Sequence, residues 1–247
     1  MQSNLAWKLA LVLKGFASPE LLTSYNVERL PVIAQMLHAT TALYTHTVIE
    51  KNFDAPEKEK TENEKATGWY RWRNTALEMY GINYRYSDLV LEQRDTKPRD
   101  QTDALARAYA GYEGLGTLCA GDRAPEASGL VIDGKDTSLF KLLTLSKHTV
   151  LIFTDFANVG DIRKALDSSS KYPEVVVQTM IVTGKEVRDF GGATIVVDRD
   201  SNARSTYLVE EGLMTVVIVR PDGFIGAILY DTDGIDGYFG KIFKISV

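Results

Sequence analysis

The segment TVVIVRPDGFIGAIL, residues 215–229, decides the fold. Two runs of mainly aliphatic and β-branched residues flank the tripeptide Pro221-Asp222-Gly223. Proline fixes φ and glycine allows a left-handed backbone, so this tripeptide is typical of a tight turn between strands. We therefore expect strands at residues 215–219 and 224–229 that pair as an antiparallel hairpin.

The chain before this hairpin alternates strand and helix patterns. Strands are predicted at residues 149–153, 175–182 and 194–197, and helices at residues 159–166 and 202–209. A strand–helix–strand unit followed by a helix and a terminal hairpin is typical of a thioredoxin-like domain. The predicted fold class is therefore α/β, with this domain at residues 75–247.

The turn that would carry the nucleophile of a thioredoxin reads TDFANVG, residues 154–160, and contains no sulfur. The single cysteine, Cys119, lies upstream in a glycine-rich loop and cannot form an internal disulfide. Thiol chemistry is therefore not predicted. A reactive Cys119 is kept only as an alternative.

The N-terminal fifty residues predict helices. One begins at Asn4, a second is opened by Ser18-Pro19-Glu20, and Pro31 should break or kink the second before a third begins. The first helix should expose an apolar stripe, and the third should bury one; their residues are Leu5, Leu9, Val12 and Phe16, then Ile33, Met36, Leu37, Leu43 and Val48. We expect a helical part at residues 1–50 and a charged linker at residues 51–74.

Composition excludes several function classes. The 247 residues carry 28 Lys and Arg against 33 Asp and Glu, which is the wrong balance for binding nucleic acid through bulk charge. The aromatic and basic residues 69–73 are therefore expected to pack rather than to stack on bases. No apolar run is long enough to span a membrane, and His38, His46 and His148 lack metal-ligand spacing. A cytoplasmic protein without metal is expected.

Four separated motifs resemble one family. NLAWKLA at residues 4–10 and LLTSYNVERLP at residues 21–31 resemble the helix pair that closes the flavin domain of FAD-dependent aromatic hydroxylases of the phenol 2-monooxygenase class. GDRAP at residues 121–125 and RPDGFIG at residues 220–226 are similar to two signatures of that family's C-terminal thioredoxin-like domain. The resemblance extends over nearly the whole chain.

The resemblance implies a flavoprotein that reduces FAD with NAD(P)H and inserts one oxygen atom into an aromatic or related substrate, in many fungal members for secondary metabolism. The residues that it marks as structural are Gly121, Asp122, Arg123, Pro125, Arg220, Pro221, Asp222 and Gly223. We expect Arg123 to bond backbone carbonyls or a carboxylate near its loop. The family's GxGxxG segment for FAD is absent, and Met1 and Gln2 would be at most the edge of a flavin site. No catalytic, cofactor-binding or metal-binding residue is therefore predicted, and FAD binding by the isolated chain is not expected.

Three hypotheses remain open. The chain is a truncated member of the monooxygenase family, a non-catalytic dimerisation or partner-binding module, or a thioredoxin-fold enzyme of unrecognised chemistry. An exposed stripe on the first helix would favour a homodimer, or a heterodimer with a full-length relative.

Overall fold

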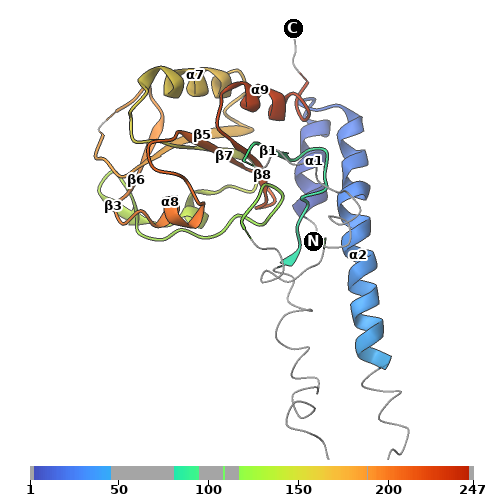
Figure 1. Ribbon diagram of the computed structural model, residues 1–247. Helices are drawn as coiled ribbons and strands as arrows, with labels where there is room; N and C mark the ends of the chain where they lie inside the picture. Colours follow the sequence, from blue (N-terminus) through green and yellow to red (C-terminus); the bar gives the residue numbers. More distant parts are fainter. Residues whose placement is uncertain (1–2, 46–80, 95–107, 109–116, 188, 245–247) are drawn as a thin grey trace, which may run out of the picture.

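The computed structural model describes residues 3–45, 81–94, 108, 117–187 and 189–244. It shows one mixed sheet covered by helices, with the helix pair α1 and α2 beside it (Figure 1). The strand order is β1-β8-β7-β4-β5-β6-β2-β3. The predicted α/β class is confirmed, and so is the thioredoxin-like character of the C-terminal part.

The centre of the sheet has thioredoxin topology. β4 (His148–Phe153) pairs in parallel with β5 (Val177–Thr183), and antiparallel with β7 (Thr215–Val219). β7 then forms the predicted hairpin with β8 (Ile225–Leu229). The edges are completed by β6 (Thr194–Asp198), β1 (Leu91–Glu92), β2 (Leu130–Ile132) and β3 (Lys135–Thr137).

Helices cover both faces of this sheet. α7 (Val159–Ser170) and α9 (Asp233–Phe239) lie on one face, and α8 (Asn202–Thr206) lies on the other (Figure 1). The short α6 (Leu139–Leu142) follows β3. α7 begins where expected because the Asn158 side chain accepts hydrogen bonds from the first free N–H groups of the helix.

The N-terminal helices pack beside the sheet. They comprise α1 (Ser3–Leu13), the 3₁₀ turn η1 (Pro19–Leu22) and α2 (Thr23–Tyr44). α1 ends at Leu13, and Gly15 follows with a φ of +79°, which suits the left-handed turn after a helix. Trp7 and Leu11 join the hydrophobic cluster beneath α7 and α9, so α1 shares a core with the thioredoxin-like domain. Among the helices of the described residues, none is long and apolar enough to cross a membrane.

The predicted break at Pro31 is wrong, because α2 runs through this proline. Proline removes one backbone hydrogen bond and crowds the preceding turn, which weakens a helix locally. Tertiary contacts compensate here, since Glu28, Arg29 and Val32 are all buried on either side of Pro31. The two helices predicted around Pro31 are therefore one.

The predicted apolar faces also need correction. Val12 and Phe16 are half-buried against the core, whereas Leu13, which was not in the predicted stripe, is 77% exposed. On α2 the predicted buried residue Leu37 is 56% exposed, and Val32 takes the buried position. The reason is that polar side chains occupy the inner faces of both helices, which displaces leucines outward. The predicted linker at residues 51–74, the cluster at residues 69–73, His46 and Val48 lie outside the described residues.

His148 is fully buried at the start of β4. Its ring lies among the rings of Trp7, Tyr238, Phe239 and Phe243, at centroid distances of 5.1 to 6.1 Å. Neither ring nitrogen has a hydrogen-bond partner among the described residues. Burial, with a smaller effect of Arg220, lowers the pKa of His148 from 6.5 to about 3.

We predict that His148 makes the protein less stable in mild acid. Between pH 6.5 and 4.5 the imidazole of His148 is protonated in the unfolded chain but stays neutral in the folded chain. As the pH decreases through this range, His148 should therefore lower the free energy of unfolding by about 1.4 kcal/mol per pH unit. His148→Leu should remove that dependence and also relieve the unpaired nitrogens. Urea unfolding at a series of pH values measures it.

His38→Leu is the control, because His38 is exposed on α2. That variant should keep the slope of the parent. An unchanged slope in His148→Leu would contradict the prediction.

Candidate functional site

The turn between β4 and α7 holds the position of the thioredoxin nucleophile. It is stabilised by an ion pair between Asp155 and Arg204 at 2.6 Å, and Gly212 N donates to Asp155 Oδ2 at 3.2 Å. Phe156 has a φ of +60° and contacts the ring of Phe190. The side chains at this turn are therefore held by charge and aromatic contacts, and no residue of it can act as a thiol nucleophile.

Cys119 lies elsewhere, in the loop that precedes the GDRAP motif. It is half-buried, and its Sγ lies 3.4 Å from the carbonyl oxygen of Thr117. Burial raises the pKa of the Cys119 thiol. Since a reactive cysteine needs a lowered pKa, this environment favours an inert thiol.

The two C-terminal motifs meet at one end of the β7–β8 hairpin. Gly121 N donates to Ile225 O at 2.7 Å, and Ile225 N donates to Asp122 O at 2.8 Å. Gly121 has a φ of +97°, and a Cβ there would lie 2.5 Å from Arg85 N, so only glycine fits. Pro125 contributes its carbonyl oxygen, which accepts from Tyr207 Oη at 3.0 Å.

The arginine that binds the loop carboxylate is Arg85, which differs from the expectation for Arg123. Arg85 donates from Nε and Nη2 to the two oxygens of Asp122, each at 2.6 Å. Arg123 is exposed, and its guanidinium lies 5.2 Å from the centre of the Phe224 ring. Among the described residues its side chain makes no hydrogen bond, so the predicted role of Arg123 is wrong. The sequence of the loop gave no hint of Arg85, which lies 37 positions before Asp122.

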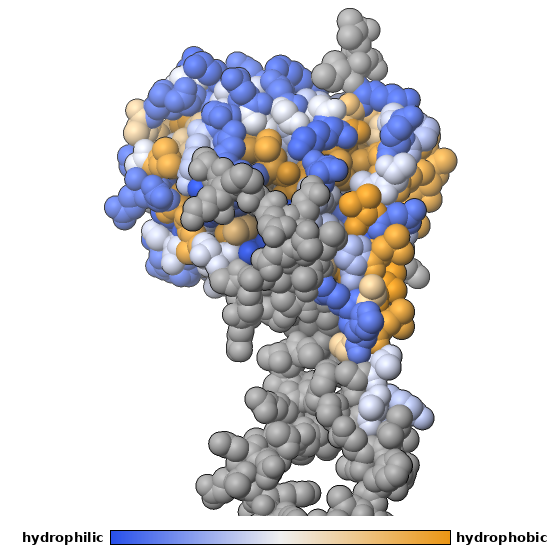
Figure 2. All heavy atoms as spheres, turned by 45° about the vertical axis from the view of Figure 1, so that its right-hand side comes forward, coloured by the Kyte–Doolittle hydropathy of each residue, from blue (hydrophilic) through white to orange (hydrophobic). Residues whose placement is uncertain are grey.

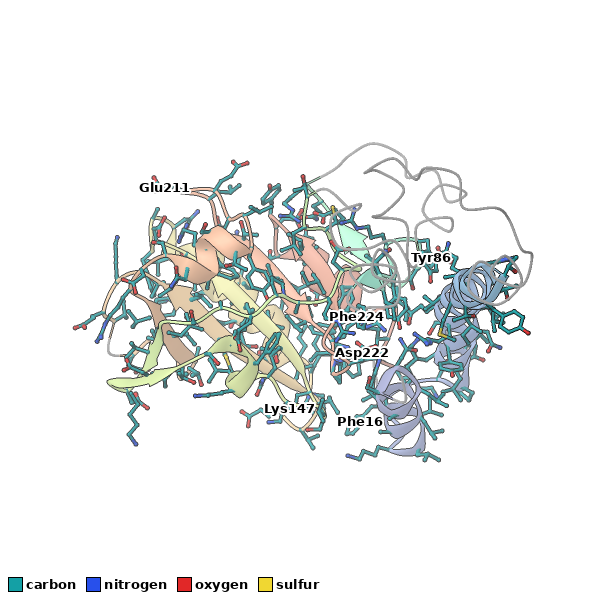
Figure 3. All side chains as sticks on the ribbon, turned by 90° about the horizontal axis from the view of Figure 1, so that it is seen from below. Phe16, Tyr86, Lys147, Glu211, Asp222 and Phe224 are labelled. Carbon is teal, nitrogen blue, oxygen red and sulfur yellow. The ribbon has the colours of Figure 1, made fainter. Side chains whose placement is uncertain are left out.

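A buried charged network, which we call the junction, joins α1 and α2 to the hairpin turn. Its residues are Asn4, Trp7, Lys8, Glu28, Ser87, Arg220 and Asp222. Figure 3 shows Asp222 and Phe224 on the side of the sheet that faces these helices. The junction therefore draws on three segments that lie far apart in the sequence.

Glu28 of α2 is the central acceptor of the junction. Its Oε1 accepts from Arg220 Nη1 at 2.8 Å and from Ser87 Oγ at 2.8 Å. Its Oε2 accepts from Arg220 Nη2 at 3.0 Å, Lys8 Nζ at 2.8 Å and Asn4 Nδ2 at 2.7 Å. The two oxygens of this buried carboxylate therefore accept five hydrogen bonds between them.

Asp222 of the hairpin turn is the second acceptor. It receives Arg220 Nε at 3.1 Å and Arg220 Nη2 at 2.7 Å, so one guanidinium bridges both carboxylates. It also accepts from Trp7 Nε1 at 3.1 Å and from Asn4 Nδ2 at 3.0 Å. α1 thus contacts the hairpin directly as well as through Glu28.

The junction is electrically balanced. Lys8 and Arg220 supply two positive charges, and Glu28 and Asp222 supply two negative ones; the side chains of all four are at most 1% exposed. Burial acts to raise the pKa of Glu28, but Arg220, Lys8 and Asn4 outweigh it and hold the pKa well below 4.5. Burial lowers the pKa of Lys8 to about 8 against the opposing effect of Glu28. Glu28, Lys8 and Arg220 are therefore charged at neutral pH.

Sequence reasoning placed Arg220 and Asp222 in a structural motif but missed Lys8 and Glu28. Both residues appear in the sequence analysis only within the two motifs at residues 4–10 and 21–31, without a role of their own. The available signal was helical spacing: Asn4, Trp7, Lys8 and Leu11 lie on one face of α1, and this face is buried. A lysine on the same face as a tryptophan and a leucine predicts a buried partner of opposite charge.

The described residues do not fit FAD. The buried polar side chains of α1 and α2 bond to one another, to the hairpin, to Ser87 and, for Arg29, to Tyr84; of these side chains, only Asn4 Oδ1 has no partner among the described residues. A cleft of about 290 Å³ beside α1 is mainly apolar and has Lys14 as its only charged lining residue. Neither supplies the glycine-rich backbone cradle that a pyrophosphate needs. In the same residues, no group of His, Cys, Asp and Glu could hold a metal ion.

We predict that neutralising Glu28 strongly destabilises the protein. Glu28→Gln would leave Lys8 and Arg220 buried with a single negative charge between them, which costs about 3 to 5 kcal/mol. Glu20→Gln, at an exposed carboxylate of η1, should change stability by less than about 0.5 kcal/mol. Chemical denaturation followed by circular dichroism measures both.

A double variant tests whether the charge balance is the cause. Lys8→Met with Glu28→Gln removes one charge of each sign, so its loss should be clearly smaller than the sum of the two single losses. Additive losses would show that the pair is not coupled.

Comparison with known proteins identifies the family. A model of the FAD-binding domain matches residues 2–40. The pentachlorophenol 4-monooxygenase of Sphingobium chlorophenolicum is 31% identical over 149 residues, 60% of this chain and 23% of that protein. The 4-methyl-5-nitrocatechol 5-monooxygenase of a Burkholderia species is 29% identical over 90% of this chain and 34% of its own length.

The fold is shared with a solved flavin-dependent monooxygenase, PieE, crystallised with FAD and substrate. The two chains are 21% identical with a TM-score of 0.62, over 97% of this chain and 42% of that one. The chain therefore spans about a quarter to two-fifths of the length of these three proteins. The chain therefore matches the FAD-binding domain family over residues 2–40 and is similar, from the helix pair through to the terminal hairpin, to FAD-dependent monooxygenases.

Proposed function

We propose that this chain is a partial member of the FAD-dependent monooxygenases and serves the oxidative tailoring of an aromatic or secondary metabolite. The observation that supports this most is the junction. Glu28 of α2 accepts two hydrogen bonds from Lys8 and Asn4 of α1, and three from Arg220 and Ser87, which lie outside the residues that the FAD-binding model matches. A connection of this kind fixes a piece of a flavin domain in one orientation.

On this proposal the thioredoxin-like domain supports the flavin domain and does no chemistry of its own. Its turn at residues 154–160 carries an ion pair where thioredoxins carry a nucleophile, and Cys119 lies in an environment that favours the neutral thiol. When bound, FAD would supply the oxygen chemistry of the family, and the residues that hold it would lie outside the described part. The chain is then not catalytic by itself.

An alternative function is that of a non-catalytic partner-binding module. The observation in its favour is the outer surface of α1, where Leu9 is 40% and Leu13 is 77% exposed. Exposed apolar patches of this kind mark interaction sites. The partner would be a second copy of the chain or a full-length relative.

The isolated chain should not retain FAD. Expressed alone and purified, it should show far less than one flavin per chain by visible absorbance, because the described residues supply no pyrophosphate cradle. Added FAD should wash out on gel filtration. A yellow protein with stoichiometric flavin would contradict the proposal, since a complete flavin site would then exist in this chain.

The isolated chain should also self-associate through α1. Light scattering at micromolar concentration should give a mass above the 27.5 kDa of one chain. Leu9→Glu with Leu13→Glu should return it to the single-chain mass, because a carboxylate is costly to bury in an apolar contact. A parent protein that is already monomeric would contradict this prediction.

A further inference from the structure

We propose that the cleft between α1 and the sheet binds a small apolar carboxylate, whose apolar part contacts Trp7 and whose carboxylate contacts Lys14. The cleft has a volume of about 290 Å³. Its lining residues belong to the described part of the chain, and none of them is required to bind FAD. The inference therefore goes beyond the proposed function and does not depend on it.

Several segments of the chain form the walls of the cleft. Leu145 precedes β4, Val176 precedes β5, and Pro221 follows β7. Since β4 and β5 are parallel and β7 is antiparallel to β4, these three residues meet at the same end of the sheet. α1 forms the opposite wall, and in Figure 3 the cleft lies between α1 and the residues just before Lys147.

The first argument is that α1 places small residues beside an apolar wall. Ala6 and Ala10 lie about one turn apart and both line the cleft, so their short side chains leave space that a larger residue would fill. Trp7 and Leu11 also line the cleft, and they are only 4% and 5% exposed. The cleft therefore has a deep apolar side and an open side of small residues.

The second argument is that the junction holds the apolar wall in place. Trp7 Nε1 donates to Asp222 Oδ2 at 3.1 Å, and the indole meets the ring of His148 edge-on at a centroid distance of 5.1 Å. Pro221 lies between Arg220 and Asp222, which both belong to the junction. A ligand would therefore meet a preformed surface and would lose little affinity to the ordering of the protein.

The third argument is charge. Lys14 is the only charged residue that lines the cleft, and its exposed ammonium group makes no ion pair or hydrogen bond among the described residues. Ser3 and Ser146 line the same cleft and supply hydroxyl groups. An ammonium group and hydroxyls bind a carboxylate through charge-assisted hydrogen bonds. The whole chain has a net charge of −5, so a preference for an anion must come from this local charge.

The fourth argument concerns the apolar part of the ligand. Leu145 is 84% exposed, the highest value among the large apolar side chains of the described residues, and a ligand in the cleft would cover it. Apolar surface also extends along the helical side of the molecule (Figure 2), but an open surface contacts a small molecule from one side only. The volume of about 290 Å³ lies just below the roughly 300–1,000 Å³ of ligand pockets, which limits the ligand to one ring or a short alkyl chain.

A titration with 3-phenylpropanoate tests the proposal. In the full chain with Trp69→Phe and Trp72→Phe, Trp7 is the only tryptophan, and its fluorescence reports binding. The emission should change saturably with a dissociation constant below about 1 mM, as expected for a ligand of this size. The uncharged 3-phenylpropanamide should bind about three- to fivefold more weakly. At ten times its Kd the acid should raise the melting temperature by about 3 °C, because it contacts α1 and the sheet together.

Two variants locate the site. Lys14→Gln should weaken binding of the acid about three- to fivefold and leave the affinity for the amide unchanged. Ala10→Leu should fill the cleft and weaken binding of both ligands at least about tenfold. The matched controls are Lys135→Gln, at an exposed lysine of β3, and Ala34→Leu, at an exposed alanine of α2. Both controls should bind the acid as the parent does.

The other outcomes contradict the inference. No saturable change up to about 10 mM acid would show that the cleft holds no such ligand. Equal affinity for the acid and the amide would overturn the role of Lys14. An Ala10→Leu variant with the circular dichroism of the parent and unchanged affinity would show that the acid binds elsewhere. If Ala10→Leu instead lowers the mass measured by light scattering and the parent binds no acid, the cleft is a contact between copies.

Discussion

The carboxylate of Glu28 is the point on which the arrangement of this protein depends. It is fully buried and accepts five hydrogen bonds from α1, from Ser87 and from the hairpin turn. A buried charge is tolerated only when its partners neutralise it and fill its lone pairs. The requirement acts in both directions. Glu28 can be buried only where α1 and the hairpin meet, and without Glu28 the two cations Lys8 and Arg220 would be buried with Asp222 as their single counter-charge.

The burial of Glu28 fixes the orientation of α1 and α2 and contributes little to the net stability of the protein. An ion-pair network in a protein interior contributes little net free energy over an apolar contact of the same shape, but it is costly to break. The guanidinium of Arg220 is planar and bridges Glu28 and Asp222 in a fixed geometry, and it also lies 5.2 Å from the centre of the Trp7 ring. A sliding of α1 along the sheet by one turn would separate these groups. The helix pair is therefore fixed in register by charge, while its apolar contacts supply most of the attraction.

The sequence predicts the sheet well because local patterns determine it. The strands on both sides of Pro221-Asp222-Gly223 lie within a residue of their expected bounds, since turn chemistry and β-branched runs act over short distances. The break expected at Pro31 was wrong, because burial of Glu28 and Val32 outweighs a local penalty. Helical spacing could have predicted that Lys8 is buried beside a carboxylate, but it could not identify the partners, because Lys8, Glu28 and Arg220 are separated by up to 212 positions.

The thioredoxin-like fold is present in this chain without the reactive group at the turn before its first helix. In that fold the turn before the first helix presents a reactive group because the helix N-terminus favours a negative charge. This chain retains the turn, the capping Asn158 and the helix, but it places Asp155 beside the turn and pairs it with Arg204. The carboxylate is neutralised within the domain and offers nothing to a substrate. The opposite end of the same sheet carries Arg220 and Asp222, the charged residues of the domain that bind α1 and α2.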